Sequence, residues 1–193
     1  MPEFNKYIHA SDYSWLIDFI VQNGTRREYL RNQPFSRANQ VSHEIGFIEQ
    51  GAFRYKSLSS DGAEHIVGYA FKNSFVCDYA SLRLQQPSLV EIESMTDSVV
   101  IALNDRVLNN FFNNTSDTLK KSRSAIEILY SELYERYVRS YTNTPEERYV
   151  ELITRNPEVL QTIPLKELAS YLNIRPETLS QIRKNIKKSR GLI

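Results

Sequence analysis

Polar and basic side chains recur near the end of the 193-residue sequence, at positions that an apolar helical pattern leaves exposed. Leu179, Ile182 and Ile186 repeat at helical spacing and would form a buried face. The exposed candidates are Arg175, Glu177, Thr178, Ser180, Gln181, Arg183, Lys184, Lys187 and Lys188. Hydroxyl, amide and carboxylate groups can bond base edges in the major groove, and cations pair with phosphates. The pattern therefore predicts a helix that contacts double-stranded DNA.

A second helical pattern comes directly before this one. Leu168 and Leu172 line one face, and the small Ala169 allows another helix to cross closely. Ile174 would fill the turn between the two helices. The spacing predicts a helix-turn-helix over residues 163–183, whose second helix fits the major groove. The alternative is a pair of helices in a larger bundle with a solvated basic face.

Net charge alone argues against a basic nucleic-acid binder, because the sequence has 24 Lys and Arg residues and 23 Asp and Glu residues, for a net charge of +1. The distribution is uneven. Residues 174–193 hold six basic residues and one acidic residue, a net charge of +5. The first 173 residues then hold 18 basic and 22 acidic residues, a net charge of −4. A mildly acidic body is thus followed by a basic end.

Residues for catalysis or metal binding are sparse. The single cysteine, Cys77, cannot form an internal disulfide, a multi-cysteine zinc site or an iron–sulfur cluster. The histidines are His9, His43 and His65. Two of them neighbour a glutamate on an expected strand, but adjacent strand residues point to opposite faces. We therefore expect no metal, no cofactor and no enzyme activity. The alternative is a cupin-like β-roll that binds a small molecule or acts as a metal-dependent enzyme, with a structural helical tail.

Membrane and export signals are missing from the sequence. No apolar run approaches the roughly 20 residues needed to span a bilayer, and the first residues lack a charged-then-apolar leader. The sequence therefore predicts a cytoplasmic protein with no membrane partner.

The elements that must position the basic helix begin with one amphipathic helix. Ser11 or Asp12 would cap it, Leu16 and Ile20 would be buried, and Gly24 would end it. Short β-type runs follow, at residues 45–49, 52–58, 64–71, 89–94 and 99–103. Asp61-Gly62 predicts a two-residue type I′ turn. Short strands at this spacing predict an antiparallel sandwich or barrel.

A long helix is expected from near Ser116 to Tyr141. Residues 118–141 would extend for roughly 36 Å at 1.5 Å per residue, which is longer than a compact domain of this size needs. One face of this helix is apolar and rich in tyrosine. The predicted dimer interface is formed by Leu119, Ile126, Leu129, Tyr130, Leu133 and Tyr137. The alternative is an ordinary core helix.

A boundary follows at Thr144-Pro145-Glu146-Glu147. Threonine suits the N-cap, proline the first helical position, and the carboxylates the positive end of the helix. Three short helices would follow, interrupted at 156–157 and 173–175. The predicted division is a β-roll at 1–115, a dimerisation helix with a hinge at 116–143 and the helix-turn-helix at 144–193.

Residues 163–183 resemble the C-terminal domain of Crp/Fnr-family transcription regulators, and residues 46–55 and 61–66 are similar to that family's β-roll. The resemblance covers essentially the whole chain. It implies an α+β fold, with a jelly-roll, or double-stranded β-helix, of the cyclic-nucleotide-binding type, a dimerisation helix and a winged helix-turn-helix. It also implies a homodimer on DNA, with RNA polymerase as a further partner.

The sequence departs from that family at the helix, the effector site and the wing. Pro176, Glu177 and Gln181 stand where the family usually has Arg, Glu and Arg, so a different operator is expected. Gln86-Pro87-Ser88 replaces the arginine that holds a cyclic phosphate, which disfavours cyclic AMP. The sequence ends soon after the second helix, which predicts little or no wing. The candidate pocket for an unknown effector is Phe75, Asp78, Tyr79, Arg83, Ser88 and Tyr130.

Overall fold

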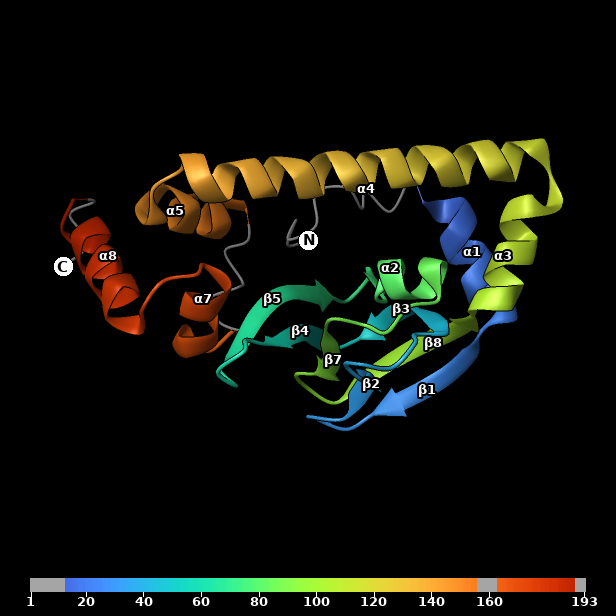
Figure 1. Cartoon of the computed structure of the whole chain (residues 1–193), viewed down its shortest axis with the longest axis horizontal. Helices are drawn as coiled ribbons and strands as arrows, with labels where there is room; N and C mark the ends of the chain where they lie inside the picture. Colours follow the sequence, from blue (N-terminus) through green and yellow to red (C-terminus); the bar gives the residue numbers. More distant parts are fainter. Residues whose placement is uncertain (1–12, 156–162, 190–193) are drawn as a thin grey trace.

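The structure is a computed structural model that describes residues 13–155 and 163–189 (Figure 1). Its elements, in chain order, are α1 (Ser14–Asn23), β1 (Thr25–Tyr29), β2 (Pro34–Ser36), β3 (Glu44–Gln50), β4 (Ala52–Leu58), β5 (Glu64–Phe71), β6 (Phe75–Val76), α2 (Tyr79–Leu84), β7 (Glu91–Ser94), β8 (Ser98–Asn104), α3 (Asp105–Asn114), α4 (Ser116–Thr142), α5 (Pro145–Arg155), α7 (Leu165–Tyr171) and α8 (Pro176–Ser189).

The strands form two antiparallel sheets of four strands each. The first has the order β1-β8-β3-β6 and the second the order β2-β7-β4-β5. Ile48, Phe53 and Val100 are fully buried between them, because alternate residues of each strand face the interior. The predicted β-roll is confirmed. Three short strands, β1, β2 and β6, did not stand out in the sequence, and four of the five residues of β1 are exposed.

The hairpin between β4 and β5 differs from the sequence-based expectation. The connection runs over residues 59–63, and the Ser59 amide donates to the Ala63 carbonyl. Only Gly62 in this turn has a positive φ, of +81°. The Asp61 carboxylate instead accepts bonds from the Ser59 hydroxyl and the Ala63 amide. The predicted two-residue type I′ turn is therefore wrong, because an Asx-type bond stabilises a longer loop.

Helices α1 and α3 pack together at one end of the roll (Figure 1). The rings of Phe19 and Phe111 stack with centroids 3.6 Å apart. Helix α1 begins at Ser14 and has no side-chain hydrogen bond at its N-cap, Tyr13. The expected caps Ser11 and Asp12 lie outside the described residues.

Helix α4 runs along the length of the molecule over the roll, to the cluster of α5, α7 and α8 at the other end (Figure 1). A capping box between Thr115 and Thr118 starts α4, which ends at Thr142. A second box starts α5, in which the Thr144 amide donates to Glu147 and the Glu147 amide donates to the Thr144 hydroxyl. The Thr144 amide and hydroxyl both donate to the Glu147 carboxylate and lower its pKa. The long helix and the cap after it match the sequence pattern, whereas the expected break at 156–157 lies outside the described residues.

No helix in residues 13–155 and 163–189 is long and apolar enough to cross a bilayer.

Candidate functional site

Helices α7 and α8 form a tightly joined pair. Leu168, Ala169 and Leu179 are almost completely buried where the helices meet. Asn173 has a φ of +53°, which allows the chain to turn directly after α7. The Ile174 amide then donates to the Ala169 carbonyl at 3.0 Å and closes the end of that helix. The predicted turn thus has a local cause, because asparagine tolerates this left-handed conformation.

The residues proposed for DNA contact are Arg175, directly before α8, and side chains of α8 itself. Eight of them are exposed: Arg175, Glu177, Thr178, Ser180, Gln181, Lys184, Lys187 and Lys188. Arg183 is half-buried. The Ser180 hydroxyl donates to the Pro176 carbonyl of its own helix at 2.9 Å. The structure therefore places a largely open polar face on α8, with Ser180 turned to its own backbone.

The sequence analysis did not include Asn185 among the candidate residues of α8. The Gln181 Nε2 donates to the Asn185 Oδ1 at 2.9 Å, so the two amides lie side by side one turn apart. The i,i+4 spacing of two amide residues was the available signal. This bond orients the Gln181 side chain along the exposed face.

Helix α7 packs against the edge strand β5 of the second sheet. Arg54 Nη1 donates to Glu167 Oε1 at 2.7 Å. The Ile66 amide donates to the Ser170 hydroxyl at 2.9 Å, so an edge-strand donor is satisfied by the helix. Local sequence patterns carry no signal for these contacts, because their partners are more than 100 residues apart. The helix pair is therefore held against the roll by an ion pair, a hydrogen bond and apolar packing.

Glu93 organises the charges beside this contact. Its carboxylate accepts from Lys56 Nζ at 2.7 Å and pairs with the Arg54 guanidinium. Burial alone would raise the pKa of Glu93, but the hydrogen bonds from Lys56 and Arg54 outweigh burial and lower it. Arg54 thus joins Glu93 of the roll to Glu167 of α7.

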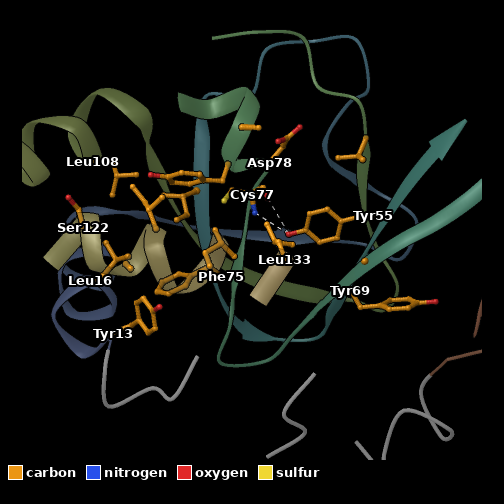
Figure 2. Close-up of a pocket in the computed structure, with 18 of the residues that line it drawn as sticks. Tyr13, Leu16, Tyr55, Tyr69, Phe75, Cys77, Asp78, Leu108, Ser122 and Leu133 are labelled. Atoms are coloured by element: carbon orange, nitrogen blue, oxygen red, sulfur yellow. Dashed lines mark hydrogen bonds between the residues drawn. The ribbon is translucent and has the colours of Figure 1, made fainter. Parts of the chain in front are cut away.

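A cavity of about 400 Å³ lies between the roll and α4 (Figure 2). Figure 2 shows roll side chains such as Phe75 facing α4 side chains such as Leu133. Of the expected effector residues, Phe75, Asp78 and Tyr79 line this cavity, whereas Arg83, Ser88 and Tyr130 are not among its lining residues. The sequence analysis did not predict most of the lining residues, because they come from α1, β3, β4, β5, α3 and α4, which are far apart in the sequence.

The two oxygens of Asp78 are both hydrogen-bonded beside the cavity. Oδ1 accepts from the Ser81 amide at 3.1 Å and thereby caps α2. Oδ2 accepts from the Ser88 hydroxyl at 2.6 Å, and Ser88 is buried. Ser88 therefore acts by holding Asp78 rather than by lining the cavity.

The α4 residues proposed for dimerisation fall into two groups. Leu119, Tyr130 and Tyr137 are exposed and do not line the cavity. The others, Ile126, Leu129 and Leu133, line it, and Ile126 and Leu133 are also partly open to solvent, at 40% and 48% exposed. One side of α4 thus covers the cavity, and an adjacent apolar side faces solvent.

The histidines form no metal site among the described residues, where no group of three or more His, Cys, Asp or Glu side chains could hold an ion. His43 Nδ1 lies 3.5 Å from an Asp105 carboxylate oxygen. His9 lies outside the described residues.

Comparison with known protein families gives a match over residues 26–115 to the family described as the cyclic nucleotide-binding domain. This match covers a little under half of the chain. The matched residues span the roll from β1 to α3, so most of the roll residues that line the cavity lie within the match. A search of curated protein sequences gives no significant match.

Solved structures extend the likeness beyond the cyclic nucleotide-binding domain. FixK2 from Bradyrhizobium japonicum has a TM-score of 0.70 at 16% identity, with 87% of this chain and 86% of that chain covered. The c-di-GMP-responsive global regulator CLP from Xanthomonas campestris has a TM-score of 0.65 at 15% identity, with 91% and 92% covered. A CooA mutant from Carboxydothermus hydrogenoformans has a TM-score of 0.67 at 13% identity, with 89% and 79% covered. The fold is therefore that of Crp/Fnr-type regulators.

Proposed function

We propose that this protein is a cytoplasmic, homodimeric transcription regulator that binds DNA in a sequence-dependent way and senses a small molecule in its β-roll. The observation that carries the proposal is the open polar face of α8. It lies on a two-helix unit in a chain with the fold of Crp/Fnr-type regulators. The second helix of such a unit enters the major groove with its first turns against base edges.

The chemistry of α8 supports direct reading of bases. Thr178 and Gln181 lie in its first two turns, where side chains reach base edges. A glutamine side chain suits adenine, which offers one acceptor and one donor in the major groove. Lys187 and Lys188 follow in the last turn and would pair with phosphates. The two ends of α8 thus have different roles, one for sequence and one for affinity.

Homodimerisation is proposed through the solvent-facing side of α4. Leu119, Tyr130 and Tyr137 are 46%, 67% and 60% exposed, which is unusual for large apolar side chains along one helix. Pairing two copies of α4 about a two-fold axis would bury them. It would also present two α8 helices to one DNA duplex.

The proposed division of labour follows the chain order. Residues 1–115 would sense the signal, residues 116–143 would pair the subunits, and residues 144–193 would bind DNA. The hinge lies where α4 ends and α5 begins, near the Thr144 capping box. A ligand would act by favouring one arrangement of the α8 helices over another.

Selection from a random DNA library tests this function. The purified protein should enrich an inverted repeat, because a two-fold dimer reads the same half-site twice. A doubly substituted Thr178→Ala/Gln181→Ala protein should lose the enrichment while still binding DNA weakly. A wild-type protein that enriches no sequence would contradict the proposal.

A further inference from the structure

Two hydrogen-bond donors beside the start of α2 are already used by the chain. The amide of Ser81 and the hydroxyl of Ser88 are the kinds of donor that a phosphate oxygen would accept from. Both donate instead to the carboxylate of Asp78. An anionic ligand at this place would lie against a fixed negative charge and would find these two donors occupied.

The rest of the lining offers little for a charged ligand. Among the lining residues that the structure describes, Asp78 and Arg136 are the charged ones, and Arg136 already interacts with other groups of the chain. A neutral ligand avoids the large free-energy cost of burying an unpaired charge in such surroundings.

Aromatic side chains dominate the surface that remains. The rings that line the cavity are those of Tyr13, Trp15, Tyr55, Tyr69, Phe75, Tyr79 and Phe112. Burial raises the pKa of Tyr69 and Tyr79, and it raises the pKa of the Cys77 thiol to about 12. These groups are therefore neutral at physiological pH.

Tyr55 and Gly68 lie side by side in the lining of the cavity. The Tyr55 hydroxyl accepts from the Cys77 amide and donates to the Cys77 carbonyl, each at 3.3 Å, which fixes the ring (Figure 2). Gly68 on the neighbouring strand has no side chain, and a Cβ there would lie 3.5 Å from that ring. Residue 68 thus adds no side-chain atoms beside the Tyr55 ring, which lines the cavity and can contact a planar ligand.

We propose that the cavity binds an uncharged, mainly apolar molecule with an aromatic ring, and that the Asp78 carboxylate excludes anionic ligands such as cyclic nucleotides. This ligand class rests on the proposed sensing function and narrows it. A cavity of about 400 Å³ lies within the range of small-molecule sites, which are mostly apolar.

Two fluorescent probes that differ by one charged group test the ligand class. N-phenyl-1-naphthylamine is uncharged, and 8-anilino-1-naphthalenesulfonate is the same ring system with a sulfonate. In fluorescence titrations of the full chain, the uncharged probe should saturate at one per subunit. The sulfonate should bind at least about tenfold more weakly, because its charge would be buried without a partner. Cyclic AMP should not displace the uncharged probe.

Cavity-filling variants locate the bound probe. Ala125 lines the cavity from α4, and Val67 lines it from β5 and is 46% exposed. Ala125→Trp and Val67→Trp should each weaken binding of the uncharged probe about tenfold or more, because the new ring occupies the space. Ser124→Trp is the matched control, since Ser124 is exposed on α4 and does not line the cavity. Val67→Trp keeps the test valid if Ala125→Trp does not fold.

Three results would overturn the ligand class. These are equal affinity for both probes, displacement of the uncharged probe by cyclic AMP, and unchanged binding in both cavity-filling variants. If any of these occurs while the wild-type protein still enriches a DNA sequence, the ligand class is wrong and the proposed function stands. If no DNA sequence is enriched, the proposed function is wrong, and the ligand class is decided by the titrations alone.

Discussion

Single residues join the roll to the helices at its end through shared charges. Arg54 is the clearest case, since its guanidinium binds Glu93 in the roll and Glu167 in α7. The side chains of the three residues are between 11% and 21% exposed. In such surroundings, an ion left without its partner is costly.

The charge of Glu93 should stabilise the fold in a pH-dependent way. Glu93→Gln should lower the free energy of unfolding by about 1–2 kcal/mol at pH 7, because the partly buried Arg54 and Lys56 each lose one carboxylate partner and keep another, Glu167 and Glu91 respectively. The folded-state pKa of Glu93 lies below its ordinary value of 4.5. The stabilisation is therefore complete above pH 4.5 and is lost as the pH falls through the folded-state pKa. Urea unfolding of both proteins between pH 3 and pH 7, values chosen to span that range, measures the difference.

Glu28→Gln is the matched control, because Glu28 makes an ion pair with Arg26 in solvent. It should unfold like the wild-type protein. A wild-type advantage over Glu93→Gln that stays constant down to pH 3 would contradict the role given to the Glu93 charge.

Gln181 and Lys188 should affect DNA binding differently. Gln181→Ala should change base preference at one position of each half-site, at a cost of about 1–3 kcal/mol on the preferred base. Lys188→Ala should weaken binding evenly over all sequences and reduce the salt slope by about 0.9 per lost phosphate contact. Titrations of DNA duplexes at several salt concentrations measure both effects.

Lys72→Ala is the control for these titrations, since Lys72 is exposed between β5 and β6, away from α8. It should leave both base preference and salt slope unchanged. Equal effects of the Gln181 and Lys188 variants on every sequence would remove the base-reading role of Gln181.

Whole elements determine how the helix pair sits on the roll. Helix α7 supplies Glu167 and Ser170 to the roll, and Ser170 accepts from the Ile66 amide of β5. Strand β5 also lines the cavity with Val67, Gly68 and Tyr69. A change in the position of β5 would therefore alter both the wall of the cavity and the contacts of α7.

Release of α7 should be visible in hydrogen exchange. Glu167→Gln removes the charge that pairs with Arg54, so the Ile66 amide should exchange about tenfold faster as α7 detaches more often. Lys166→Gln is the matched control, because Lys166 is exposed on the same helix. Unchanged protection of Ile66 in the Glu167 variant would show that apolar packing alone holds α7.

The exposed side of α4 should determine the oligomeric state. Tyr137→Lys places a charge in the proposed dimer interface and should shift the protein toward monomer in sedimentation at micromolar concentration. Ile128→Lys is the control, since Ile128 is 44% exposed and lies on the other side of α4. If both variants dimerise like the wild-type protein, the interface is not formed by this side of α4.

At the scale of the whole molecule, the sequence predicts the elements better than their contacts. The predicted long helix agrees with α4, and the predicted strands at 52–58 and 64–71 agree with β4 and β5. These predictions succeed because the pattern of a helix or strand depends on residues close in the sequence. The prediction of a type I′ turn at Asp61-Gly62 was wrong, because side-chain hydrogen bonds stabilise a different loop. The cavity and the α7 contact could not be predicted, because Arg54 and Glu167 are 113 residues apart.

The proposed dimer on DNA makes a geometric prediction for the whole molecule. Two α8 helices related by a two-fold axis should enter major grooves on one side of the duplex. The distance between the two half-sites is then set by the distance between the two α8 helices in the dimer, and not by the affinity of either helix alone.

Hydroxyl-radical footprinting on the selected DNA, combined with the mass of the complex, tests this geometry most directly. We expect two protected half-sites whose centres are about 34–36 Å apart or a multiple of that distance, with two chains on each duplex. A single protected stretch with one chain on each duplex would contradict the proposed dimeric regulator.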